Sequence, residues 1–233
     1  WNYPVNLTLT PLAGAIAAGN CAVLKPSNYS PETSKVIAAL IAETFDPHFV
    51  TVVTGGREEN SSLLEQPFDY IFFTGGATVG RLVMEAAARR LTPVTLELGG
   101  KSPCIIDKTA DIKTAARRIL FGKLLNGGQT CVAPDYVLIH KEVQEAFIEQ
   151  CKATLREFLP TEAYISCNVP RIVNDKHFER LMHLIEGEHA VIGGDADAHA
   201  RFIPLTVLDG VSFDAPVMQE EIFGPILPLI PFT

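Results

Sequence analysis

The sequence lacks the features that would place it in several large classes of protein. No apolar run reaches the ~18–20 residues of a membrane-spanning helix, because the longest stretch, Pro11–Leu24, is broken by Pro11, Asn20 and glycines. The start carries no basic signal-type segment, so we expect no membrane association in this stretch. Basic residues are also scarce, with 19 Lys and Arg against 27 Asp and Glu and a net charge of −8. That balance disfavours nucleic acid as a partner, because its phosphates would repel the chain.

The cysteines and histidines form none of the usual paired motifs. The five cysteines are an odd number at wide spacing, with no Cys-x-x-Cys, and they are Cys21, Cys104, Cys131, Cys151 and Cys167. We therefore expect neither a disulfide framework nor a zinc cluster, and the composition favours a cytoplasmic, reducing location. No His-Glu-x-x-His pattern occurs, so no metal site is predicted.

Two familiar glycine-rich phosphate loops are also missing. There is no Gly-x-Gly-x-x-Gly, and Gly99–Ser102 lacks the glycine that a P-loop needs five residues before Gly100. The segment Gly75–Gly80, which includes Gly76, still follows an apolar strand pattern and begins a helical one. Free backbone amides and the positive end of the helix dipole would suit an anion there. An ordinary strand-to-helix turn explains the same residues, and both interpretations stay open.

What is present is a regular alternation of short apolar runs with helical stretches. Strand-like runs such as Cys21–Leu24 and Tyr136–His140 alternate with helical patterns such as Pro31–Thr44. This order predicts an α/β fold with a parallel sheet. The character of the chain changes near Gly99–Gly100, where we place a domain boundary between residues 1–99 and 100–233. The stretch Pro160–Val173 has weak periodicity and is expected to be a loop.

Two residues carry the strongest chemical signal. Cys131 follows Gly127-Gly128 and precedes Pro134, which favours an accessible loop and a thiol able to act as a nucleophile. Glu97 ends an apolar strand pattern, where a carboxylate could serve as a base. The alternatives are a buried structural cysteine and a structurally partnered glutamate. Lys25 also ends a strand, where open α/β sheets bind ligands, although it could simply extend to solvent.

Six motifs in this order resemble the aldehyde dehydrogenase superfamily, and its class 3 branch in particular. They are Trp1-Asn-Tyr-Pro4, Leu24-Lys-Pro-Ser27, Phe73-Thr-Gly-Gly76, Leu96-Glu-Leu-Gly-Gly-Lys101, Gly128-Gln-Thr-Cys131 and Glu220-Glu-Ile-Phe-Gly-Pro225. The resemblance implies an aldehyde dehydrogenase-like fold. Residues 1–99 would form part of a Rossmann-like cofactor domain, and residues 100–233 part of an α/β catalytic domain. Members of the family are about twice this length, so the chain is expected to be a piece of a longer protein, which the resemblance implies is a homodimer.

The resemblance also implies roles for individual residues. Cys131 would be the nucleophile and Glu97 the base that activates the hydrolytic water. Asn2, together with the Cys131 backbone N–H, would stabilise the oxyanion formed from the aldehyde. The residues implied in binding NAD or NADP are Lys25 at the adenosine ribose, Gly75, Gly76 and Gly80 at the pyrophosphate, Glu221 at the nicotinamide ribose and Phe223 near the nicotinamide.

Asn28 departs from the family pattern. The family commonly has glutamate after Lys-Pro-Ser, whereas this chain has Asn28. Losing that carboxylate removes a charge that would repel a 2′-phosphate, so we expect NADP to be accepted alongside NAD. The resemblance points to medium-chain aliphatic or aromatic aldehydes as substrates. Two other functions stay open, an acylating relative that passes the thioester to coenzyme A and a non-catalytic relative of the fold.

Overall fold

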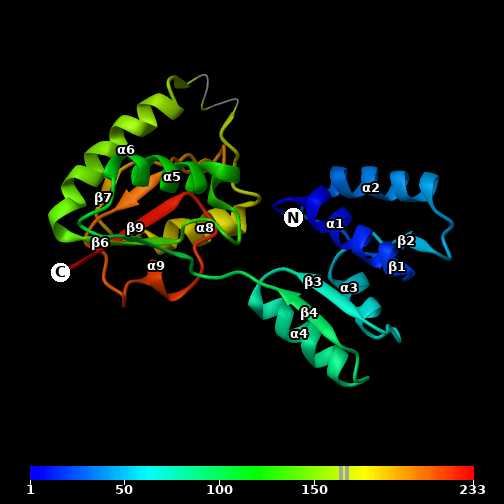
Figure 1. The fold of residues 1–233 in the computed structure, drawn as a ribbon. Coiled ribbons are helices and arrows are strands. Elements are labelled where there is room, and N and C mark those ends of the chain that lie inside the picture. Colours follow the sequence, from blue (N-terminus) through cyan, green and yellow to red (C-terminus); the bar gives the residue numbers. More distant parts are fainter. Residues whose placement is uncertain (163–164, 166–167) are drawn as a thin grey trace. The chain divides into compact units, whose positions relative to one another are not determined.

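The computed structural model describes residues 1–162, 165 and 168–233 (Figure 1). Part of the loop expected at Pro160–Val173, and with it Cys167, falls outside the described residues. The chain forms two compact units, Trp1–Gly99 and Gly100–Thr233. Their assignment as cofactor and catalytic domains stays a prediction.

The first unit alternates helices with short parallel strands. In chain order its elements are α1 (Pro4–Ala17), β1 (Ala22–Leu24), α2 (Pro31–Thr44), β2 (Val50–Val52), α3 (Arg57–Leu64), β3 (Ile71–Thr74), α4 (Ala77–Ala88) and β4 (Val94–Glu97). The strands form two parallel pairs, β1 with β2 and β3 with β4. Each partner strand is reached through a helix, as parallel pairing requires.

Helix α2 shows how the local sequence sets this unit. Pro31 occupies the first helical turn, where the N–H it lacks is not needed, and Ser30 precedes it. Ile37 and Ile41 are buried in a small core with Leu12 of α1 and Val50 of β2. The helix also carries the apolar residues Val36 and Leu40, which are 67% and 48% exposed. They lie about 100° around the helix from the buried pair, on its outer side.

The second unit is built on one five-stranded sheet. Its elements are β5 (Pro103–Ile106), α5 (Ile112–Leu124), the 3-10 helix η1 (Leu125–Gly128), β6 (Tyr136–His140), the 3-10 helix η2 (Lys141–Val143), α6 (Gln144–Phe158), α8 (Asp175–Leu184), β7 (Ala190–Ile192), β8 (Thr206–Leu208), α9 (Pro216–Gln219) and β9 (Ile226–Phe232). The strand order is β5-β6-β9-β8-β7, parallel except for the antiparallel pair β7–β8. The predicted α/β fold with parallel strands is confirmed.

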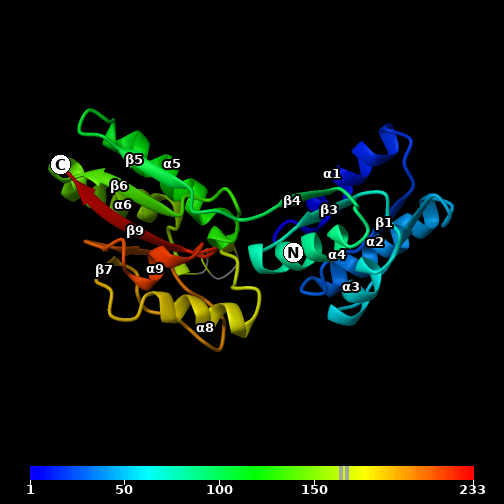
Figure 2. The same cartoon turned by 90° about the horizontal axis from the view of Figure 1, so that it is seen from below.

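Strand β9 lies at the centre of this sheet and is buried on both faces. Leu227 and Leu229 pack in a core with helices α5 and α6. Ile226 and Ile230 pack on the opposite side with α8 and α9. Figure 2 shows the two helical layers on either side of the sheet. A continuous apolar run is typical of such a strand, because neither face meets water.

No helix among the described residues combines the length and the apolar character needed to cross a bilayer.

The turn after α5 uses left-handed backbone at three consecutive residues. Asn126, Gly127 and Gly128 have φ values of 51°, 62° and 72°. A Cβ on Gly128 would lie 2.2 Å from the carbonyl oxygen of Gly224. Only glycine allows these two backbones to approach so closely, so Gly128 holds the turn that leads to Cys131 against the segment before β9.

We predict that Gly128→Ala strongly destabilises the protein, because it adds a backbone clash to the strain of a positive φ. Gly210→Ala is the matched control, since Gly210 has a φ of +66° but no atom within 4 Å of a built Cβ. The control should cost about 1–2 kcal/mol, the usual penalty of a left-handed residue, and Gly128→Ala at least twice as much. Thermal unfolding of both variants measures the difference. Equal losses would show that the close approach to Gly224 contributes nothing.

Candidate active site

The loop that carries Cys131 is fixed by the side chain of Gln129. Gln129 is 2% exposed. Its Nε2 donates to the carbonyls of Asn126 at 3.0 Å and Arg171 at 3.2 Å, and its Oε1 accepts from the Val173 N–H at 3.1 Å. These bonds join the loop to the segment before α8. Cys131 therefore sits, half-buried, on a rigid support.

The other described cysteines differ from Cys131 in their surroundings. Cys151 is fully buried in the core, and burial raises the pKa of its thiol to about 12. Burial also raises the pKa of the Cys104 thiol. Cys21 is exposed. A thiol with a raised pKa forms little thiolate, so Cys151 and Cys104 are poor nucleophiles near neutral pH.

Glu97 and the Gly75 turn lie together at the carboxyl end of the β3–β4 pair. Glu97 is the last residue of β4 and pairs with Thr74, and its carbonyl accepts the Gly75 N–H at 3.0 Å. The Glu97 side chain is exposed within the described chain. Asn2 is half-buried just before α1. Asn2 and Glu97 belong to the first unit and Cys131 to the second, so the meeting of these three side chains stays a prediction.

The glycines of the predicted anion site have different surroundings. Gly76 is the N-cap of α4, and a Cβ built on it meets no atom within 4 Å. Open space in front of first-turn amides suits a bound anion. Gly80 is buried, and its built Cβ would lie 2.8 Å from Leu98 Cδ2. Close packing of α4 is therefore sufficient to explain the glycine at position 80.

Lys25 is anchored at the carboxyl end of the β1–β2 pair. Its Nζ donates to the carbonyls of Gly55 at 2.7 Å and Pro26 at 3.0 Å. Partial burial lowers its pKa, and the nearby Glu59 carboxylate opposes that shift. Glu59 Oε2 in turn accepts the Gly56 N–H at 2.6 Å, at the start of α3. Glu59 was not predicted from the sequence, although a glutamate at the third position of a helix can accept a hydrogen bond from the N–H of the capping residue.

The loop with Glu221 and Phe223 is held by charged side chains that the sequence analysis also missed. Lys101 Nζ donates to Asp135 Oδ2 at 2.5 Å and to the carbonyls of Val217 at 3.1 Å and Glu220 at 2.9 Å. Asp135 Oδ1 accepts the Ile222 N–H at 3.0 Å. These bonds fix the backbone on both sides of Glu221.

Arg180 of α8 holds the same loop from a second direction. Its Nη2 donates to the carbonyl of Ile222 at 2.5 Å, and its Nη1 donates to Glu221 O at 3.2 Å and Glu220 Oε1 at 2.8 Å. Phe223 is held at a positive φ of 51°. A bulky residue in this conformation is strained, and such strain persists only where the surroundings fix it.

Glu221 itself fits the role of a hydroxyl acceptor. Its Oε1 is buried and has no hydrogen-bond partner in the structure. Burial raises the pKa of its carboxyl, while a hydrogen bond from the Gly100 N–H lowers it. A buried acceptor without a donor is costly, and a ribose hydroxyl would supply one. The residues present therefore suit a dinucleotide at this position.

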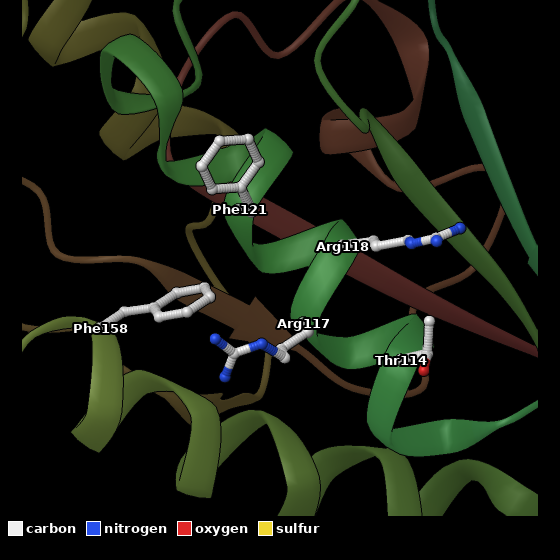
Figure 3. Close-up of a pocket in the computed structure, with 5 residues that line it drawn as sticks. All are labelled: Thr114, Arg117, Arg118, Phe121 and Phe158. Atoms are coloured by element: carbon white, nitrogen blue, oxygen red, sulfur yellow. The ribbon is translucent and has the colours of Figure 1, made fainter.

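A separate hollow lies on the outer side of α5 and α6. It has a volume of about 440 Å³ and is lined by Thr114, Arg117, Arg118, Phe121 and Phe158 (Figure 3). The Arg117 guanidinium lies over the Phe158 ring, 5.0 Å from its centroid. None of the predicted site residues lines this hollow. Within the described residues, no group of three or more His, Cys, Asp and Glu side chains could hold a metal ion.

Comparison with known proteins adds independent evidence. The model of the aldehyde dehydrogenase family matches residues 1–233. Aldehyde dehydrogenase family 3 member B1 of Mus musculus is 52% identical over 230 residues, which are 99% of this chain and 49% of that protein. The chain thus spans about half the length of the curated relatives it matches.

Solved structures of aldehyde dehydrogenases also resemble the whole chain. The substrate-bound state of AldH from Staphylococcus aureus matches with a TM-score of 0.96 and 50% identity, covering 100% of this chain and 51% of that one. An aldehyde dehydrogenase of Mycobacterium tuberculosis complexed with NAD⁺ matches with a TM-score of 0.88 and 32% identity, covering 100% and 50%. The expected resemblance to class 3 enzymes is confirmed, and the chain belongs to the aldehyde dehydrogenase family.

Proposed function

We propose that the full-length protein oxidises an aldehyde to a carboxylic acid with NAD or NADP. The observation that carries this proposal is the Cys131 loop, which in a member of this family presents a half-buried thiol on a support braced by Gln129. The close approach of Gly128 to Gly224 brings this loop against the segment that follows Glu221 and Phe223. A nucleophile next to a loop suited to a dinucleotide is what aldehyde oxidation requires.

The proposed reaction begins with addition of the Cys131 thiolate to the aldehyde carbon. A C–S bond forms, and the carbonyl oxygen becomes an oxyanion that accepts hydrogen bonds from Asn2 and the Cys131 N–H. A nicotinamide held by Glu221 and Phe223 would accept hydride. Loss of that hydride from the carbon bonded to Cys131 Sγ, as the C=O bond re-forms, would leave a thioester on Cys131. Glu97 then removes a proton from water, the water oxygen adds to the thioester carbon, and the C–S bond breaks to release the acid and the thiolate.

The chain's own residues divide the binding of the dinucleotide among them. Lys25 would hold the adenosine ribose, and Gly75 and Gly76 would bring backbone amides to the pyrophosphate. Glu221 would accept from the nicotinamide ribose, and Phe223 would pack near the nicotinamide. The anchored Lys25 ammonium and the open space before α4 support this arrangement.

For the protein as a whole, we propose a cytoplasmic homodimer acting on medium-chain aliphatic or aromatic aldehydes. The net charge of −8 and the lack of paired cysteine motifs support a soluble enzyme that binds no nucleic acid.

Replacement of the nucleophile should abolish turnover. We expect Cys131→Ser in the full-length protein to lower kcat about a thousandfold or more, because an alcohol is a far weaker nucleophile than a thiolate near neutral pH. Formation of reduced nicotinamide with a panel of aldehydes measures the rate. Cys21→Ser, which changes an exposed cysteine, should leave the rate unchanged. Substantial activity in Cys131→Ser would refute the proposed mechanism.

Replacement of the base should separate the two halves of the reaction. With Glu97→Gln we expect a first burst of reduced nicotinamide of about one equivalent, followed by turnover slowed about a hundredfold, because acylation no longer leads to hydrolysis. Mass spectrometry should detect the acylated Cys131. Glu85→Gln, an exposed glutamate on α4, serves as the control. If turnover of the unsubstituted protein instead requires coenzyme A and acyl-CoA accumulates, the acylating alternative is correct.

The choice of dinucleotide should depend on the charge at position 28. The Nδ2 of Asn28 lies 3.6 Å from the position of a Cβ built on Gly56, close to the loop that anchors Lys25. A carboxylate in Asn28→Glu would repel a 2′-phosphate by about 1.4 kcal/mol or more, so we expect kcat/KM for NADP to fall at least tenfold relative to NAD. Asn28→Gln is the neutral control. An NADP affinity already over a hundredfold below that of NAD in the unsubstituted protein would contradict this account.

A further inference from the structure

Two buried polar atoms stand out in the second unit. In the part of the chain that the structure describes, the buried side-chain atoms without a hydrogen-bond partner are Lys123 Nζ and Glu221 Oε1. One belongs to a cation and the other to a carboxylate. Lys123 has no exposed surface and lies in the last turn of α5. A buried ammonium without a partner is costly, so its retention calls for a physical reason.

Lys123 Nζ makes no hydrogen bond to its charged neighbours in the structure, and Asp135, the carboxylate that attracts it most, already has a partner at each oxygen. The carboxylate of Asp135 accepts from Lys101 through one oxygen and from the Ile222 N–H through the other. The three N–H groups of the Lys101 ammonium match its three acceptors. Glu221 is the carboxylate near Lys123 that still has a free, buried oxygen.

The contacts of the loop fix the backbone around Glu221 and leave one oxygen of its side chain without a partner. Arg180, Asp135 and Lys101 hold the main chain of the loop through the carbonyls of residues 220–222 and the Ile222 N–H. The Glu221 carboxylate accepts a hydrogen bond from the Gly100 N–H, while its Oε1 has no partner. Lys123 reaches the same region on a flexible four-carbon stem.

We propose that Lys123 is a positioning residue that pairs with the Glu221 carboxylate, keeping it ionised and directed toward the ribose hydroxyls of the dinucleotide. Lys123 acts through Glu221 and does not touch the reacting atoms. This inference rests on the proposed function, because it assumes that Glu221 holds the nicotinamide ribose. A buried carboxylate without a cation would tend to take up a proton, and a neutral carboxyl is a weaker acceptor for hydroxyl groups.

A double-mutant cycle on the full-length protein tests this pairing. Isothermal titration calorimetry gives the Kd of NAD for the unsubstituted protein, Lys123→Met, Glu221→Gln and the double variant. We expect each single change to weaken NAD binding about tenfold and the double variant to bind no more weakly than either. Lys113→Met, an exposed lysine on the same helix, should leave the Kd unchanged. Should Lys123→Met fail to fold, Lys123→Gln takes its place in the cycle.

Independent effects of the Lys123 and Glu221 substitutions on the Kd of NAD would overturn the proposal. A double variant weakened about a hundredfold, or a Lys123→Met protein that binds NAD normally while Glu221→Gln does not, would show that Lys123 does not act through Glu221. If the unsubstituted protein binds no dinucleotide, the proposed function fails instead. In that case the Tm values of the same four proteins decide the pairing. A loss of Tm in the double variant that is smaller than the sum of the two single losses supports the pairing, and a loss equal to that sum refutes it.

The pH dependence of stability gives a readout that a merely space-filling residue would not affect. Burial lowers the pKa of Lys123 from 10.5 to about 8, with Asp135, Glu221 and Cys104 opposing the shift and Lys101 adding to it. Because the unfolded chain holds this proton up to higher pH, Lys123 makes the folded state more stable as pH rises from about 8 to 10.5. Lys123→Met should lose this rise in Tm, and Lys113→Met should keep it. Equal slopes in the two variants would contradict a buried, titrating Lys123.

Discussion

The arrangement of the second unit depends on a partly buried ion pair between Lys101 and Asp135. Their side chains are 22% and 4% exposed, and the Nζ–Oδ2 distance is 2.5 Å. Lys101 comes just before β5, and Asp135 just before β6. Together they bind the main chain of Val217 in α9 and of Glu220 and Ile222 in the segment that leads from α9 to β9. Residues that immediately precede the neighbouring strands β5 and β6 thus fix the loop that leads into β9.

A buried pair of this kind contributes more to the arrangement of the chain than to its overall stability. Removing two charges from water costs several kcal/mol per ion, and their mutual attraction compensates only when the remaining donors and acceptors are also satisfied. Lys101 and Asp135 meet that condition through backbone partners. Lys123 and Glu221 do not meet it in the structure, and this contrast distinguishes a structural pair from groups available for binding.

The sequence predicted the regular elements well where patterning and end signals agreed. Helix α2 occupies the expected range, Pro31–Thr44, because Pro31 marks its start and apolar residues recur at helical spacing. Strand β6 also has the expected bounds, Tyr136–His140. Helices α1 and α3 were not predicted. Pro11 inside α1 resembles a break, and α3 is a short polar helix held by the Gly56–Glu59 capping contact.

The site was less accessible to prediction than the fold. Cys131, Glu97 and Glu221 could be named because they lie in recognisable motifs, but the groups that hold Glu221 in place come from distant parts of the chain. Lys123 did leave a signal, because it falls on the buried stripe of α5 with Ala116, Ile119 and Leu120. A lysine on an apolar helical face suggests a buried charge, yet its partner depends on tertiary structure. Sequence spacing alone cannot identify that partner.

The shielding of the Lys101–Asp135 pair has a consequence for behaviour in concentrated salt. Mobile ions screen charges that face water, such as Arg117 and Glu157, whose side chains are 44% and 61% exposed. They have little access to Asp135, at 4% exposed. High ionic strength should therefore weaken the Arg117–Glu157 ion pair on the outer side of α5 and α6. The Lys101–Asp135 pair should continue to hold the segment that leads into β9.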